Sequence, residues 1–228
     1  MKLVYFSILY AFSCCCYGQE DMYGNVARNN LEAIGGASGV VRTFDNRYEG
    51  VKGTPYLFEH WKSGVLYLRN GSTIEFSKGN YNKFEDEFIF IESDRVIYIE
   101  ISEINSIEIE SESRILTFVT FTPMKCQSEP EGYFQVLFDG KVTLLKKYRT
   151  RFTKADYQGA YNSDSRYDEF QNKPSLYYFG LSMCKLFRVK LNKKSLSRFF
   201  KGQEMDIDLT GFDGSETSLI GILNSAKR

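Results

Sequence analysis

Apolar and polar residues alternate with a period of two along much of the chain, beginning near Tyr56. In residues 96–102, for example, Ile97, Ile99 and Ile101 alternate with tyrosine, glutamate and serine. Successive side chains of a β-strand point to opposite faces, so this pattern places one face in a core and the other in water. It predicts an antiparallel sheet of roughly eight to ten strands, because strands buried in a parallel sheet would be apolar throughout.

Two dipeptides mark hairpin turns within this region. Asn70-Gly71 and Asp139-Gly140 each separate two alternating segments, and both tolerate the positive φ that tight hairpins require. The polar, tyrosine-rich residues 157–174 are predicted to form a long connection or a capping loop, and residues 175–191 a further strand pair.

The pattern changes to helical spacing at the end of the chain. Residues 192–202 are predicted to form a helix with Asn192 as N-cap, and residues 215–227 a second one. Their apolar faces are formed by Leu196, Phe199 and Phe200 and by Leu219, Ile220 and Leu223. The fold class is therefore α+β and β-dominated: an antiparallel meander sheet or partly open barrel with two C-terminal helices.

The N-terminus has the pattern of an export signal. Lys2 is followed by the apolar run Leu3 to Phe12 and then by small or polar residues, which predicts a signal peptide ending at Gly18. An alternative takes "AFSC" as a lipoprotein box, with Cys14 lipidated. The expected organisation is a signal peptide at 1–18, a flexible arm at 19–39, an antiparallel β domain at 40–190 and a helical pair at 191–228.

Charge content limits the expected partners, and cysteine content limits the expected disulfides. The 228 residues include 29 Lys and Arg and 29 Asp and Glu, so no bulk charge favours nucleic acid, and membrane attachment would depend on the lipid anchor. Cleavage at Gly18 would leave Cys126 and Cys184, which either form a disulfide in an oxidising compartment or remain two thiols.

Three segments resemble a group of uncharacterised exported proteins of Bacteroidetes-type bacteria: Thr43 to Gly71, Leu144 to Phe170, and the C-terminal "ETSLIGILNSAKR". The resemblance implies the periplasm or outer envelope of a Gram-negative bacterium and carries no known activity. In that group a lysine pattern lies between the two final helices, and this chain has "GQEMDIDLTGFDGS" there instead.

The sequence favours a non-catalytic binding or structural role, with an envelope protein, peptide or glycan as partner and without cofactor or metal. Aromatic residues can stack on sugar rings, and the charged segment "RTFDNRYEG" could face a ligand or form a salt-bridge cluster. The candidate binding surface consists of Arg47, Tyr48, Trp61, Tyr161, Tyr167 and Asp168.

A hydrolase of envelope polymers is the alternative function, with Asp168 or Glu169 as acid/base near His60 or Tyr161. Such chemistry needs two carboxyl groups across a cleft, whereas adjacent carboxylates on a strand point apart. The run Glu85 to Glu87 is accordingly expected to lie in a solvated turn.

The segment Asp206 to Glu216 has some features of a calcium loop, but its glutamate falls one position early. A capping box is the preferred interpretation, with Asp213 as N-cap of the last helix and Glu216 as its reciprocal partner.

Overall fold

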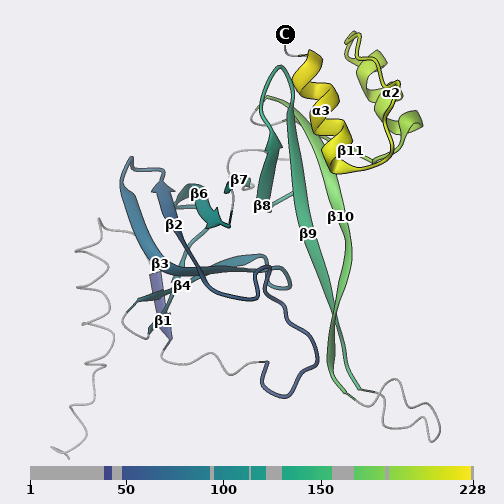
Figure 1. Ribbon diagram of the computed structural model, residues 1–228. Coiled ribbons are helices and arrows are strands. Elements are labelled where there is room, and N and C mark those ends of the chain that lie inside the picture. Colours follow the sequence, from purple (N-terminus) through teal and green to yellow (C-terminus); the bar gives the residue numbers. More distant parts are fainter. Residues whose placement is uncertain are drawn as a thin grey trace, which may run out of the picture.

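The computed structural model describes residues 39–42, 48–92, 95–112, 114–121, 130–155, 167–182 and 185–226. Within these residues, eleven strands form one antiparallel sheet, and two helices follow at the C-terminal end (Figure 1). This arrangement confirms the β-dominated α+β prediction. The strands are β1 (Gly39–Arg42), β2 (Lys62–Leu68), β3 (Thr73–Asn82), β4 (Glu87–Glu92), β5 (Arg95–Ile99), β6 (Ile104–Ser111), β7 (Arg114–Phe121), β8 (Gly132–Phe138), β9 (Thr143–Thr153), β10 (Glu169–Ser182) and β11 (Lys185–Val189), and the helices are α2 (Lys193–Gly202) and α3 (Glu216–Ala226).

The strand order is β1-β5-β4-β3-β2-β6-β7-β8-β9-β10-β11. Most neighbours are consecutive hairpins, but β6 pairs with β2 instead of β5. The link between β5 and β6 is only the turn Glu100–Glu103, closed by a 2.9 Å hydrogen bond from Glu103 N to the Glu100 carbonyl. The ends of β5 and β6 are therefore close together although three strands separate them in the sheet, so β2 to β6 must curl into an open half-barrel.

Both predicted hairpins are confirmed. Asn70-Gly71 connects β2 to β3, with Gly71 at φ +88°, and Asp139-Gly140 connects β8 to β9. The positive φ at Gly71 is the conformation for which the dipeptide was identified.

The predicted connection at 157–174 is partly wrong, because β10 already begins at Glu169 and includes Pro174. The register of β10 against β9 shifts between Lys173 and Leu176. Proline cannot donate a ladder hydrogen bond, and this irregularity accommodates it inside a long strand.

Three apolar clusters stabilise the sheet. The first fills the half-barrel around Phe88, Phe118 and Ile107, and the second lies between the helices and the sheet around Phe179 and Leu196. A third cluster, with Phe134 and Leu145 among its members, belongs to β7, β8, β9, β10 and β11. Figure 1 shows the half-barrel on one side of the molecule and the long β9–β10 hairpin on the other, with both helices at one end of that hairpin.

Segment 48–61 is attached to β3 by buried asparagines. Asn80 Oδ1 accepts a 3.1 Å hydrogen bond from the amide of Phe58, and Asn80 Nδ2 donates to the Phe58 carbonyl at 2.8 Å. Asn82 Nδ2 donates to the hydroxyl of Tyr48 at 3.1 Å. Both asparagines are almost fully buried, so these bonds satisfy groups that would otherwise be costly to bury.

Helix α2 is confirmed with its cap: Asn192 Oδ1 accepts from Ser195 N at 2.8 Å, and the predicted apolar face is buried. The capping box of α3 is wrong. Ser215 is the N-cap, with its Oγ accepting from Ser218 N at 3.1 Å, while Asp213 closes a turn by accepting from Ser215 N at 2.8 Å. The first helical residue, Glu216, contacts the sheet instead.

That contact is a compact polar network. Glu216 Oε1 accepts from Lys146 Nζ at 2.7 Å and from the hydroxyl of Tyr177 at 2.5 Å. Partial burial alone would raise the pKa of Glu216, but the hydrogen bonds from Lys146 and Tyr177 more than offset it and hold the pKa below its usual value. In the neighbouring connection, Asp208 accepts from the amide and hydroxyl of Thr210, and Asp206 and Asp208 are exposed to solvent.

The two helices of the described residues, α2 and α3, lack the length and apolar character required to span a bilayer.

Candidate ligand-binding site

Of the six surface residues selected from the sequence, the structure describes Tyr48, Trp61, Tyr167 and Asp168, and none of these four lines the two cavities described below. Arg47 and Tyr161 lie outside the described residues, as do Cys14, Cys126 and Cys184. Tyr48 and Trp61 lie in the segment attached to β3, where the Tyr56 ring lies 6.4 Å from the Tyr48 ring and 5.7 Å from the Trp61 ring. These two ring contacts lie within the segment, and the Asn82 bond to Tyr48 attaches it to β3.

The row of aromatic rings continues to the loop end of the β9–β10 hairpin, where β9 ends and β10 begins. Tyr48 contacts Phe170 edge-on at 5.0 Å, and Phe170 contacts Phe152 at 5.1 Å and Phe84 at 5.5 Å. Phe84 is 45% exposed at the turn between β3 and β4. The cluster therefore connects this turn to the hairpin.

Tyr167 and Asp168 lie at that loop end, directly before β10. Tyr167 is 68% exposed, while Asp168 Oδ1 accepts from the amide of Ala155 and the Asp168 carbonyl accepts from Lys52 N, both at 2.8 Å. Glu169 pairs with Lys52 at 3.6 Å. These contacts hold the strand ends together, and none of the cavities described below includes Asp168, Glu169 or His60 among its described lining residues.

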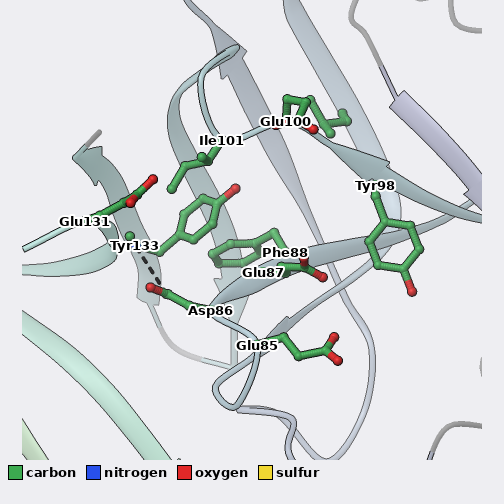
Figure 2. Close-up of a pocket in the computed structure, with 11 residues that line it drawn as sticks. Glu85, Asp86, Glu87, Phe88, Tyr98, Glu100, Ile101, Glu131 and Tyr133 are labelled. Atoms are coloured by element: carbon green, nitrogen blue, oxygen red, sulfur yellow. Dashed lines mark hydrogen bonds between the residues drawn. The ribbon is translucent and has the colours of Figure 1, made fainter. Parts of the chain in front are cut away.

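A cavity of about 460 Å³ lies where three parts of the sheet meet: the β3–β4 turn, the β5–β6 turn and the start of β8. Five carboxylate residues line it together with aromatic and aliphatic side chains. Figure 2 shows Glu85, Asp86, Glu87, Glu100 and Glu131 around the rings of Phe88 and Tyr133, with Tyr98 on the side opposite Glu131.

The expectation that Glu85 to Glu87 form a simple solvated turn is wrong for Asp86. Its Oδ1 accepts from the hydroxyl of Tyr81 at 2.5 Å and from Tyr133 N at 3.3 Å, and its Oδ2 accepts from Lys147 Nζ at 2.7 Å. Asp86 has φ +57°, a conformation that aspartate tolerates better than most residues. The positive φ turns this carboxylate toward β8 and β9.

Close packing around Asp86 requires a glycine on the facing strand. Gly132 has φ +121°, and a Cβ there would overlap the Asp86 carboxylate and Lys147 Nζ. Lys147 also donates a hydrogen bond to the Glu131 carbonyl. Asp86, Gly132 and Lys147 therefore fix one wall of the cavity.

The lining carboxylates create a negative potential, which contributes to a raised pKa of the neighbouring Tyr133 hydroxyl. Burial raises the pKa of Tyr133 far above its usual value, and the charges of Asp86, Glu87 and Glu100 raise it further. Tyr133 is therefore neutral at physiological pH. A positively charged group entering the cavity would experience the same field with favourable sign.

The sequence argument placed the acidic run in a solvated turn and therefore missed the tertiary contacts of Asp86. Glu85 and Asp86 do lie in a turn, and Glu87 begins β4. Other lining groups come from the end of β5, the β5–β6 turn and the start of β8, which are far apart in the chain. The one available signal was the acidic run from Glu85 to Glu87.

Among the described residues, no three His, Cys, Asp or Glu side chains are grouped closely enough to hold a metal ion. The carboxylates of the cavity are thus distributed around its wall instead of converging on a point.

Comparison with known proteins adds no relative: no family model, no curated protein and no solved structure matches the chain.

Proposed function

We propose that this is a non-catalytic binding protein of the bacterial cell envelope, and that its ligand site is the cavity beside Asp86 and Tyr133. The observation that supports the proposal is the combination of an open cavity with five acidic and several aromatic lining residues. The ligand class that fits this chemistry is an organic cation, such as a quaternary ammonium group or the side chain of a basic peptide.

The two kinds of lining residue have complementary roles. Carboxylates attract a positive charge, and aromatic faces bind alkylated ammonium groups, which lose little hydration on leaving water. The volume of about 460 Å³ lies within the range of small-ligand pockets.

The envelope location rests on the N-terminal residues 1–18 and on the resemblance to exported proteins of Bacteroidetes-type bacteria. Mass spectrometry of the native N-terminus tests it. A chain starting at Gln19 supports soluble export, a lipidated Cys14 supports an anchored form, and an intact Met1-Lys2 terminus contradicts export.

The hydrolase alternative has less support than binding. Asp168 and Glu169 hold strand ends, and His60 is exposed.

Calorimetric titration with choline tests the binding proposal, with 3,3-dimethyl-1-butanol as its uncharged carbon analogue. We expect choline to bind and the neutral analogue to bind much more weakly. Glu100→Gln and Glu131→Gln should each weaken choline by roughly threefold to fivefold, since each removes about 0.5–1 kcal/mol of attraction at a partly exposed site.

Glu112→Gln is the matched control, because Glu112 is exposed and does not line the cavity. Equal affinity for choline and its neutral analogue, or an equal effect of all three substitutions, would contradict the proposal.

A further inference from the structure

A second cavity, of about 520 Å³, lies in the curled half of the sheet. Its apolar lining comes from four successive strands of the half-barrel. The apolar lining residues include Leu66 of β2, Ile74 and Phe76 of β3, Phe90 of β4, and Ile97 and Ile99 of β5.

The lining is apolar surface that the fold leaves incompletely covered. Ile74, Phe76, Ile97 and Ile99 are partly buried and pack against the half-barrel core. Burying such surface under a ligand is favourable in proportion to the area removed from water. The mouth of a curled or barrel-like sheet is also a common place for small-molecule sites.

The two cavities meet at one side chain. Among the described residues that line them, Ile99 is common to both. The rings of Phe88, in the acidic cavity, and Phe90, in the apolar one, are stacked 6.4 Å apart on the same face of β4. An elongated ligand that passes Ile99 would therefore contact carboxylates at one end and aliphatic and aromatic side chains at the other.

Charge at the apolar cavity limits which amphiphile fits. Glu75 and Glu92 line it, and Ser63, which also lines it, donates a 2.5 Å hydrogen bond to Glu110. A ligand with an anionic head, such as a fatty acid, would meet repulsion at either end of the combined site.

We propose that the two cavities form one elongated site for a cationic amphiphile, with its charged head beside Glu100 and Glu131 and its alkyl chain between β2 and β5. This inference rests on the proposed function, because it uses the acidic cavity as the head-group site. It adds the apolar chain as a second requirement for tight binding.

Titration with a series of alkyltrimethylammonium ions, from ethyl to octyl and below micelle-forming concentrations, tests the proposal. Each buried methylene should tighten binding about fourfold, until the chain fills the cavity. If choline binds but affinity does not rise with chain length, the elongated site is wrong while the head-group site stands. If neither choline nor any member of the series binds, both are wrong.

Filling the apolar cavity gives the sharper test. Ile74→Trp should remove most of the chain-length dependence and leave choline binding unchanged. Ser77→Trp, at an exposed position in the same lining, is a second filling variant in case Ile74→Trp does not fold.

The matched control is Ile115→Trp, because Ile115 is 63% exposed and lines neither cavity. Equal loss of long-chain binding in the control would overturn the assignment, as would nonanoate binding as tightly as octyltrimethylammonium, which carries the same octyl chain.

Discussion

The Nζ of Lys147 donates a 2.7 Å hydrogen bond to Oδ2 of Asp86, although 61 residues separate the two in the chain. The pair joins the β3–β4 turn to β9, and so connects the half-barrel to the long hairpin. The Asp86 and Lys147 side chains are 28% and 18% exposed, which shields the interaction from much of the solvent.

We expect measurable coupling between these two residues. In a double-mutant cycle with Asp86→Asn and Lys147→Met, the interaction energy from urea unfolding should be about 1–2 kcal/mol, above that of typical surface pairs. The control is the Lys52–Glu169 pair, 3.6 Å apart with Lys52 71% exposed, which should show coupling below about 0.5 kcal/mol. Equal coupling energies in the two cycles would contradict the idea that the Asp86–Lys147 pair connects the half-barrel to the long hairpin.

Gly132→Ala should destabilise the protein by more than about 3 kcal/mol, because it combines an unfavourable positive φ with overlap of the Asp86 carboxylate. Gly71→Ala is the comparison, since Gly71 also has positive φ but has open space around it. Its cost should be only about 1 kcal/mol. Thermal and urea unfolding of both variants measure the difference, and similar losses would contradict the proposed crowding.

Asn80→Ala should cost about 2–3 kcal/mol, because it leaves the amide and carbonyl of Phe58 without their buried partner. Hydrogen exchange should also become faster at Phe58 and Leu57, since the segment loses its attachment to β3. Asn105→Ala, at an exposed position of β6, should leave both stability and exchange at these amides unchanged. Unaltered exchange in Asn80→Ala would mean that other contacts hold the segment.

Glu216 should make stability depend on acid. Its pKa in the folded protein lies below its usual value, so the carboxylate contributes stability above the unfolded-state pKa of about 4.3, and this contribution is lost as pH falls through the folded-state pKa. Glu216→Gln should therefore be less stable than the wild type near pH 7, by about 1 kcal/mol, and the gap should narrow toward pH 3. Urea unfolding across this range, with Glu112→Gln as control, measures the effect. A gap that stays constant with pH would contradict it.

The elements that the sequence predicted correctly depend on neighbouring residues. Asn70-Gly71 and Asn192 act through bonds and dihedral angles within a few positions, so the turn and the helix start were readable from local chemistry. Ser215, and not Asp213, is the N-cap of α3. Glu216 does not fold back on the cap, because its carboxylate accepts hydrogen bonds from Lys146 and Tyr177 on the sheet. No local pattern contains that contact.

Prediction also failed where strand order departs from chain order. The pairing of β6 with β2 decides the curl of the half-barrel, and both cavities depend on that curl. Apolar and polar residues alternate along a strand in the same way whichever strand pairs with it, so this pattern does not reveal the strand order. Tyr48 and Trp61 of the predicted surface each contact the Tyr56 ring, and the cavity beside Tyr133 was not foreseen.

The position of β6 beside β2 also has a consequence for the order in which the chain folds. The hydroxyl of Tyr67 on β2 reaches Glu108 on β6 across 41 residues of chain, and β3, β4 and β5 all lie in the intervening loop. The local hairpins within that loop can form quickly, whereas joining its ends requires a larger entropy loss before any contact compensates it. We therefore expect the pairing of β2 with β6 to be the slow step of folding. The hairpins β2–β3, β3–β4 and β4–β5 should form first and bring the two strands together.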